Sequence, residues 1–290
     1  MDREQIPFVK MHGLGNDYIY LDEREVEIPD PAPWAAILSD RHRGIGADGL
    51  IILRRDREFP VRMEMYNADG SRSGMCGNGL RCVARLARER GYATSDQFEI
   101  AVDGGSCPVK ILRDEDEINA VSVALAVPTI APQPLNLSWE NGELEGTPVE
   151  IGNPHFIHHI ESDLMSFPLE TVGPAIEHHP VFPNRTNVGI AQVIDRERID
   201  LRVWERGSGE TQACGSGATA AVAALHAHGK VDNNVVVKVL GGFLTITIGD
   251  DLRPWMTGAA QESFRGVFSR DWVRHSQEVE AEPSLEKHST

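Results

Sequence analysis

The pattern of apolar and polar positions predicts two strand-rich units, each with one helix at its centre. Short apolar runs bounded by glycine and polar residues are typical of strands. In the first unit they cover residues 7–11, 18–22, 49–55, 61–67, 97–102, 107–113 and 118–125, and in the second 150–160, 188–194, 200–206, 234–240 and 243–249. Alanine-rich helices are predicted over 78–90 and 216–228, each followed by a glycine of the kind that ends helices. A further helix is predicted within residues 31–43.

The two units repeat one another around a cysteine. Residues 63–81 contain the run MCGNG and residues 201–219 contain ACGSG, and the two cysteines, Cys76 and Cys214, stand 138 positions apart (214 − 76). At the same offset Tyr66 aligns with Trp204 and Gly91 with Gly229. Such self-similarity at a fixed spacing marks an internal structural repeat.

Other glycine-bearing landmarks recur in the same order. Residues 15–18 (GNDY) are echoed by 152–155 (GNPH), residues 44–46 (GIG) by 187–189 (NVG), and the glycine pair at 104–105 by the pair at 241–242. The first and third pairs repeat at an offset of 137 (152 − 15; 241 − 104) and the second at 143 (187 − 44). We therefore expect two copies of one fold in this chain.

Both repeated cysteines are placed just before a helix, with Asn78 and Ser216 as good N-cap residue types. The first backbone N–H groups of a helix lack intrahelical partners and carry partial positive charge, so a thiol there ionises more readily and a carboxylate can dock. The flanking glycines let a small anion approach the backbone. We expect Cys76 and Cys214 to be functional, and Cys82 and Cys107 to be buried apolar residues.

Composition excludes several classes of protein. The chain has 290 residues, 41 % hydrophobic, with a net charge of −16, which repels nucleic acid and anionic membrane surfaces. No apolar run reaches the ~18 residues of a membrane span, and no apolar signal segment opens the chain. Four cysteines are too few for a disulfide scaffold, so free thiols in the cytoplasm are expected.

The sequence carries no sign of a metal or a cofactor. It has no Cys-x-x-Cys pair and no His-Glu-x-x-His motif. Residues 44–49 (GIGADG) match the dinucleotide fingerprint, but a predicted helix precedes them and a predicted strand follows, the reverse of what that fingerprint needs. None of the five lysines stands in an evident pyridoxal-binding context. We therefore expect no metal, nicotinamide or pyridoxal phosphate.

Two equivalent thiols suit the inversion of a stereocentre at an amino-acid α-carbon. One thiolate removes the proton from one face, and the other thiol returns a proton on the opposite face. The substrate carboxylate would lie between the two helix N-termini, which help to stabilise the carbanion-like transition state. A thiol acyl-transferase or protease with a single nucleophilic cysteine and His155 as base is the alternative from another enzyme class. A non-catalytic binding protein would need neither thiol.

Six sequence blocks, in order, resemble the diaminopimelate epimerase family, whose members interconvert LL- and meso-diaminopimelate without pyridoxal phosphate in lysine and peptidoglycan synthesis. They are HGLGNDY, ADG, MCGNGLRC, GNPHF, NRTNVG and ERGSGETQACGSGA, and the resemblance runs from about Lys10 to about Phe268. It implies a cytoplasmic isomerase, a homodimer, that takes a small-molecule substrate. A related proline racemase would keep both thiols but should lack Arg206 and the set of asparagines, because its substrate has one carboxylate.

The resemblance also implies an α/β fold of two pseudo-symmetric domains, each a mostly antiparallel curved sheet around a central helix, with the active site between them. We expect an N-terminal domain over residues 1–127, joined by about 265–275, and a C-terminal domain over 128–264. Residues 276–290 are expected to form a disordered tail, because they have few apolar residues and no periodic pattern.

Residue roles carry over by motif. Cys76 and Cys214 would be the acid and base, and His155 and Glu205 would tune thiol protonation and hold the substrate ammonium. Charge logic assigns the distal carboxylate to Arg206. The remaining substrate-binding positions implied by the resemblance are Asn16, Asn67, Asn153 and Asn187, with the backbone amides of Gly77, Asn78, Gly215 and Ser216 for the reacting carboxylate.

Two positions depart from some members of the family. Gly49 stands where certain members have a glutamine that reaches substrate, and Phe264 stands where some have a tyrosine at the dimer contact. If the two thiol loops can close on one another, Cys76 and Cys214 are expected to form a reversible, inactivating disulfide, which needs Cα atoms within about 7 Å.

Overall fold

The computed structural model describes residues 5–140 and 142–281. Its helices are α1 (Pro31–Ser39), α2 (Gly77–Glu89), α3 (Leu169–Glu177), α4 (Gly215–Ala227) and α5 (Arg270–Ala281), with a short 3₁₀ turn, η1, at Leu164–Ser166. The strands of the first half are β1 (Gln5–Gly13), β2 (Asn16–Asp22), β3 (Gly49–Arg54), β4 (Arg62–Asn67), β5 (Arg72–Ser73), β6 (Gln97–Val102), β7 (Gly105–Asp114), β8 (Glu117–Ala124) and β9 (Thr129–Ile130). Those of the second half are β10 (Leu135–Trp139), β11 (Gly142–Glu150), β12 (Pro154–Ile160), β13 (Asn187–Asp195), β14 (Arg198–Glu205), β15 (Gly209–Glu210), β16 (Asn234–Val239), β17 (Gly242–Ile248), β18 (Pro254–Gly258) and β19 (Gln261–Ser269).

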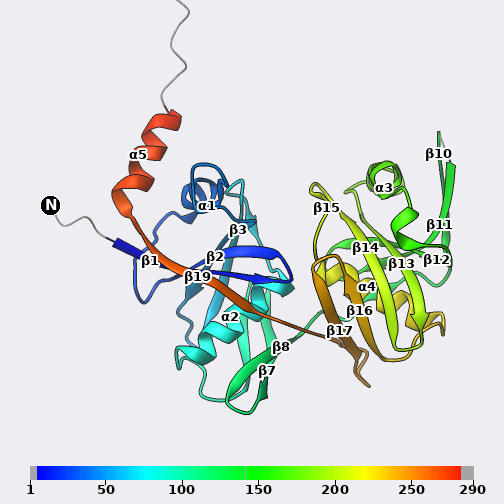
Figure 1. Ribbon diagram of the computed structural model, residues 1–290, viewed down its shortest axis with the longest axis horizontal. Helices are drawn as coiled ribbons and strands as arrows, with labels where there is room; N and C mark the ends of the chain where they lie inside the picture. The colour runs from blue at the N-terminus through cyan, green and yellow to red at the C-terminus, as the bar shows by residue number, and fades with distance from the viewer. Residues whose placement is uncertain (1–4, 141, 282–290) are drawn as a thin grey trace, which may run out of the picture.

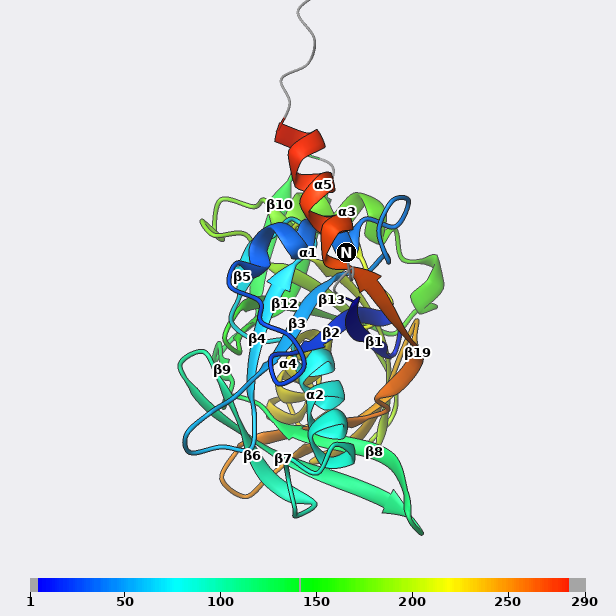
Figure 2. The same cartoon turned by 90° about the vertical axis from the view of Figure 1, so that its left-hand side faces the viewer.

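The chain folds into two lobes, each a curved and mostly antiparallel sheet around one helix (Figure 1). Helix α2 is the central helix of the first lobe and α4 that of the second, and in the view of Figure 2 the two lobes lie one behind the other. The two helices are in contact. The predicted α/β class and the two central helices are confirmed. No helix within residues 5–140 and 142–281 is long and apolar enough to cross a membrane.

Hydrogen bonds between strands join the lobes into one continuous sheet. Strand β18 of the second half pairs with β8 of the first, and β19 then crosses back to pair with β1 along its whole length. Both pairings are antiparallel. The end of the chain therefore belongs to the sheet in which the chain began.

The repeat seen in the sequence is repeated in the strand register. Leu50 faces Tyr66 across β3 and β4, and Val188 faces Trp204 across β13 and β14, so both partners shift by 138 positions (188 − 50 and 204 − 66). The parallel pairings β2 to β3 and β12 to β13 correspond in the same way. Because register fixes which side chains share a face of a sheet, the two lobes present equivalent positions at equivalent places.

One landmark of the repeat is corrected by this register. The sequence aligns residues 44–46 with 187–189. In the structure the residue equivalent to Asn187 of β13 is Gly49 of β3, and not Gly44, because Gly49 pairs with Tyr18 as Asn187 pairs with His155. The similar sequences of residues 44–46 and 187–189 gave an offset of 143, whereas the strand register gives 138 (187 − 49). The GIGADG run leads into strand β3, as predicted, and not into a helix.

Helices α1 and α3 are equivalent elements that cover the outer faces of the two sheets. Their first residues, Pro31 and Leu169, differ by 138 positions (169 − 31). A cluster that includes Trp34 of α1 packs on the first sheet, and one that includes Val172 of α3 packs on the second. The largest buried cluster lies inside the sheets, and residues from both α2 and α4 contribute to it.

Helix α5 is not predicted from the sequence, and it runs into the expected disordered tail. Trp272 and Val273 pack against the cluster around α1, and the Ser276 hydroxyl donates to the carbonyl of Trp272. This packing stabilises α5, whose polar composition does not indicate a buried contact. Residues 276–281 of the expected disordered tail are therefore helical. Residues 282–290 lie outside the described part of the chain.

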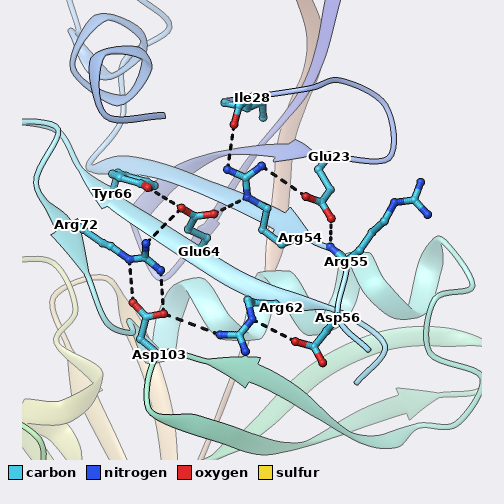
Figure 3. Close-up of polar contacts among 10 residues, drawn as sticks. All are labelled: Glu23, Ile28, Arg54, Arg55, Asp56, Arg62, Glu64, Tyr66, Arg72 and Asp103. Carbon is cyan, nitrogen blue, oxygen red and sulfur yellow. Dashed lines mark hydrogen bonds and ion pairs between the residues drawn. The ribbon is translucent and has the colours of Figure 1, made fainter. Parts of the chain in front are cut away.

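A charged network joins β3 and β4 to their neighbours on the first lobe (Figure 3). Glu64 of β4 accepts hydrogen bonds from Arg54 and from the Tyr66 hydroxyl, and Arg72 pairs with Asp103 at 2.9 Å. Burial alone would raise the pKa of Glu64, but these partners hold it below its ordinary value. Tyr66 thus occupies one end of an ion network, whereas its repeat counterpart Trp204 lies in the second lobe beside the site described next.

Candidate active site

The two cysteines are themselves the N-cap residues of the central helices. Cys76 precedes α2 and Cys214 precedes α4, both with extended backbone. The Cys214 sulfur accepts a hydrogen bond from the Gly217 amide at 3.3 Å. The sequence names Asn78 and Ser216 as capping types, and this is corrected by two positions. The Cys214 sulfur takes the place of the usual capping oxygen, whereas Cys76 occupies the N-cap position without a side-chain cap hydrogen bond.

The starts of the two central helices converge on one side chain. A Cβ added to Gly77 would lie 2.6 Å from Met256 Cε, and one added to Gly215 would lie 2.6 Å from Met256 Sδ. The Asn78 amide also donates to the carbonyl of Ala213, the residue before Cys214, at 3.1 Å. A side chain at either glycine would therefore displace the end of the Met256 side chain, which lies between the two helix starts.

Burial sets the ionisation of both thiols. It raises the pKa of Cys76, although the amides of Gly79 and Asn78 and the Tyr18 hydroxyl oppose that rise. It raises the pKa of Cys214 further, and the nearby carboxylate of Glu205 adds to the effect. The helix starts act in the direction that the sequence predicts, but the expectation of thiols that ionise more readily is wrong for the ligand-free protein, because desolvation outweighs the helix N-terminus.

Glu205 lies at the end of β14 and is bound to Thr211, whose hydroxyl donates to Oε1. Burial raises the pKa of Glu205, while Thr211 and Cys214 lower it. The Cys214 thiol and this carboxylate thus affect one another directly. The predicted proximity of Glu205 to a cysteine is present.

His155 is buried on β12, 1 % exposed, and its Nε2 lies 3.1 Å from the Asn153 Oδ1. Burial and the charge of Arg206 lower the pKa of His155 to about 3, so the ring is neutral near pH 7. Nδ1 has no hydrogen-bond partner within the described residues. Nor does His155 form a hydrogen bond with either thiol there, so the structure brings it to Asn153 and not to the cysteines.

Asn187 and Arg206 tie two loops of the second lobe together. The Asn187 side chain donates to the Pro154 carbonyl at 2.8 Å and accepts from the Arg206 amide at 2.9 Å. The Arg206 guanidinium donates to the Asn184 carbonyl at 2.9 Å. Asn187 therefore uses its side chain on the protein backbone, and it positions the loop that carries Arg206.

The first-lobe asparagines differ in their surroundings. Asn16 lies within 3.3 Å of the Cys76 sulfur, which donates to its Oδ1. Asn67 ends β4 and donates to the Ser71 hydroxyl at 2.9 Å. Asn16 is thus beside a thiol, whereas Asn67 is held within its own turn.

A cavity of about 600 Å³ lies beside Arg206 on the second lobe. Its lining is formed by Glu150, Gly152, Asn153, Pro154, Val181, Phe182, Pro183, Asn184, Arg185 and Arg206. Two arginines and two asparagine side chains make it suited to a carboxylate. Of the residues that the sequence singles out, Asn153 and Arg206 line this cavity and the cysteines do not.

Three residues near the thiols escape the sequence analysis. Tyr18 acts on Cys76, Thr211 holds Glu205, and Met256 separates the two helix starts. Thr211 lies within the ERGSGETQACGSG block, so its place there is a signal that could have found it. Tyr18 lies within the HGLGNDY block in the same way, whereas Met256 depends on contacts between distant segments, which no local pattern shows.

The two departures from the family are also placed. A Cβ on Gly49 would lie 2.2 Å from the Tyr66 carbonyl oxygen, so this backbone leaves no room for a side chain there. Phe264 on β19 is 48 % exposed and stacks edge-on against Phe8 at 5.8 Å. Glycine at 49 is therefore required by the close approach of β4 to this position of β3.

The chain matches known proteins along most of its length. A family model described as diaminopimelate epimerase matches residues 8–129 and 147–262. The diaminopimelate epimerase of Moorella thermoacetica is 39 % identical over 278 residues, which cover 91 % of this chain and 99 % of the relative. That of Geobacillus kaustophilus is 40 % identical over 279 residues, covering 90 % and 96 %.

Solved structures share the fold at low identity. A phenazine biosynthesis protein of the PhzF family from Bacillus anthracis superposes with a TM-score of 0.73 at 16 % identity, covering 91 % of this chain and 99 % of that one. A hydroxyproline epimerase from Agrobacterium vitis superposes with a TM-score of 0.72 at 14 % identity, covering 93 % and 94 %. These likenesses confirm the two-lobed architecture, and the sequence matches show that the chain belongs to the diaminopimelate epimerase family.

Proposed function

We propose that this protein inverts one α-carbon of LL-2,6-diaminopimelate to give the meso isomer, with two thiols as its acid and base. The observation that supports this most is the convergence of two helix starts, each capped by a cysteine, on Met256. An α-carboxylate bound beside Met256, at the first turns of α2 and α4, would meet backbone N–H groups from both helices. Its α-carbon would then lie between Cys76 and Cys214.

The reaction consists of two proton transfers. The thiolate of one cysteine takes the α-proton, the electron pair remains on the α-carbon and its carboxylate, and the thiol of the other cysteine returns a proton to the opposite face. Amides of Gly77, Asn78, Gly215 and Ser216 would stabilise the charge that develops on the carboxylate. No redox step is needed, and we propose that the protein works without pyridoxal phosphate.

Glu205 and His155 would act as hydrogen-bond or proton acceptors during the reaction. The carboxylate of Glu205 is buried beside Cys214, where it can hold a substrate ammonium group or accept a proton from the thiol. The unpartnered Nδ1 of neutral His155 offers a second acceptor. Because both acceptors are buried, a hydrogen bond that the substrate makes with either is strengthened by the low local dielectric.

The distal carboxylate of diaminopimelate would bind in the cavity beside Arg206. A guanidinium can bind a carboxylate through two parallel hydrogen bonds, and the Asn153 amide faces the same cavity. We propose that Asn67 and Asn187 lie at the edge of the substrate-binding site. Asn187 holds the loop that carries Arg206, and Asn67 is the repeat equivalent of Glu205 (205 − 67 = 138).

Hydrogen exchange at the α-carbon tests the proposal directly. LL-diaminopimelate incubated with the reduced protein in D₂O should give the meso isomer with deuterium at the inverted centre. Proline and hydroxyproline, offered under the same conditions, should not exchange, because neither supplies a second carboxylate for Arg206. Absence of exchange with diaminopimelate would overturn the proposal, and covalent acylation of one thiol would favour a nucleophilic enzyme instead.

The expected domain division, cytoplasmic location and homodimer belong to the same proposal. The pairing of β19 with β1 supports joining about 265–275 to an N-terminal domain of residues 1–127, with 128–264 as the C-terminal domain.

Phe264 and Val267, 48 % and 61 % exposed on β19, support a homodimer contact along that strand. Sedimentation equilibrium of the wild type and Val267→Glu checks it, with a monomeric variant as the expected result.

All four cysteines are free in the structure. The disulfide between Cys76 and Cys214 therefore stays a prediction for oxidised protein without substrate. Mild oxidation should remove activity, and a thiol reductant should restore it. Oxidised protein with full activity would contradict it.

A further inference from the structure

The side chain of Asn16 is held between a carboxylate and a thiol. Its Nδ2 donates to Asp48 Oδ2 at 2.8 Å, and its Oδ1 accepts from the Cys76 sulfur at 3.3 Å and from Asn78 Nδ2 at 3.3 Å. Asp48 lies just before β3, in the GADG run. Neither the repeat nor the sequence motifs give Asp48 a catalytic role.

The orientation of this amide is dictated by its partners. An ionised carboxylate only accepts hydrogen bonds, so the Asn16 atom that faces Asp48 must be the nitrogen. The carbonyl oxygen is then left to face Cys76. Asp48 is fixed in turn, because Arg41 donates to its Oδ1 at 2.9 Å and the Asp17 amide donates to its Oδ2 at 3.1 Å.

Asn78 is oriented by the same kind of logic from the other side. Arg81 only donates, and its Nη1 lies 2.9 Å from Asn78 Oδ1, while the Ala213 carbonyl only accepts and lies 3.1 Å from Asn78 Nδ2. Asn78 must therefore direct an N–H at Asn16. Arg81 is itself 0 % exposed and donates to the Ala259 carbonyl at 3.2 Å.

These contacts form one chain of hydrogen bonds with a single direction. It runs from the Arg81 guanidinium through the amides of Asn78 and Asn16 to the Asp48 carboxylate. Reversing the Asn16 amide would set its Nδ2 against the N–H of Asn78 and its oxygen against Asp48. A carbonyl oxygen, the one atom type in an amide that stabilises a thiol over a thiolate, is thereby presented to Cys76.

We propose that Asp48 is a positioning residue that acts through Asn16 to keep Cys76 as a neutral thiol donor in the substrate-free protein. This inference rests on the proposed role of Cys76 as an acid or base. Asp48 does not touch the reacting atoms, since its contact with the thiol passes through the Asn16 amide. Loss of Asp48 would leave the Asn16 Nδ2 with only its 3.5 Å contact to the Tyr18 hydroxyl, and the N–H of Asn78 alone would oppose rotation of the amide. The Asn16 N–H could then turn toward the sulfur more readily and favour the thiolate.

Other titratable groups also act on the Cys76 sulfur. They are Tyr18 and Tyr20 on β2, Arg81 and Cys82 on α2, and Glu205 at the end of β14. The variants below leave all of them unchanged. Asp48 also acts electrostatically on Tyr18 and Glu205, so the Asp48→Asn variant and the double-mutant cycle below separate its effect through Asn16 from its effect through space.

The experiment follows alkylation of Cys76 by iodoacetamide against pH, with the Cys76 peptide quantified by mass spectrometry in folded, substrate-free protein. Asp48→Ala should lower the midpoint by about one pH unit, that is, about tenfold more thiolate below the midpoint. Asp48→Asn removes the charge but keeps an oxygen acceptor for Asn16, so its midpoint should stay within about 0.3 unit of the wild type. Asp48→Ser, whose hydroxyl is too short to reach Asn16, gives the same reading as Asp48→Ala should the alanine variant not fold.

A double-mutant cycle with Asn16→Ala separates positioning from through-space charge. Adding Asp48→Ala to Asn16→Ala should leave the midpoint where Asn16→Ala alone puts it. An Asp48→Ala shift of equal size with and without Asn16, an equal shift in Asp48→Asn, or no shift at all would overturn the inference. Because alkylation needs no turnover, these results are independent of the deuterium-exchange test of the proposed function.

Discussion

Trp204 donates its indole N–H to the buried carboxylate of Glu177 at 2.8 Å. The other oxygen of Glu177 accepts from the Gly207 amide at 2.9 Å. Trp204 and Gly207 flank Glu205 and Arg206, so a single carboxylate at the end of α3 clamps both sides of the two charged residues of the candidate site. Glu177 is 3 % exposed, and burial, which would raise its pKa, is outweighed by these hydrogen bonds.

Glu177→Gln should therefore weaken substrate binding. The amide offers one acceptor oxygen to two donors, so either the indole or the Gly207 N–H is left opposite an NH₂ group. We expect KM for diaminopimelate to rise about tenfold, equivalent to about 1.4 kcal/mol, with a smaller change in kcat. Steady-state kinetics measure both, and Glu170→Gln at an exposed position of the same helix is the matched control. An unchanged KM would contradict the clamp.

Both thiols should be essential for turnover. Cys76→Ser and Cys214→Ser should each lower kcat at least about a thousandfold, because a hydroxyl is too weak an acid and base to replace either partner in proton transfer. Cys107→Ala is the control, since that thiol is buried and donates to the Ala124 carbonyl at 2.8 Å, apart from the site. Epimerisation assays with LL-diaminopimelate under reducing conditions measure this effect, and full activity in either serine variant would contradict the two-base mechanism.

Arg206 should matter for recognition more than for chemistry. Arg206→Met removes the guanidinium from the cavity and from the Asn184 carbonyl, and we expect KM to rise about a hundredfold with a smaller fall in kcat. Arg196→Met is a suitable control, because Arg196 is exposed and pairs with Asp232. Equal losses in kcat and kcat/KM would instead show that Arg206 acts in the transition state.

The sequence predicted those parts of the molecule that depend on local pattern and repetition. The central helices and the two cysteines follow from glycine-rich starts, alanine-rich faces and an offset of 138. Helix α3 was missed although α1 predicts it at that offset, because Gly173 and Pro174 within it weaken the helical pattern. Glu177, at its end, could therefore not be connected with Trp204.

Long-range contacts decided the remaining features. Asp48 is one residue of an accidental dinucleotide motif in the sequence, and its contact with Asn16 arises only when β2 pairs with β3. The raised pKa of both thiols depends on burial from both lobes, which a helix-start argument does not contain. Local sequence fixes a helix terminus, but its electrostatics depend on what packs over it.

His155 should make stability depend on pH. Its pKa is lowered from 6.5 to about 3 by burial and by Arg206, so between these values the unfolded chain binds a proton that the native protein does not. Unfolding then takes up a proton, and acid favours it. The contribution of His155 is fully present above pH 6.5 and is lost progressively as the pH falls toward about 3.

Urea unfolding at pH 7, 6 and 5 measures this effect. Across that range His155 should add up to about 1.4 kcal/mol of lost stability per pH unit. His155→Gln keeps an N–H for Asn153 but cannot titrate, so the stability of this variant should fall less steeply in acid than that of the wild type. His42→Gln, at an exposed position, controls for the loss of a histidine. Parallel curves for the wild type and His155→Gln would show that His155 is protonated in the native protein, and would remove it as a neutral acceptor for the substrate.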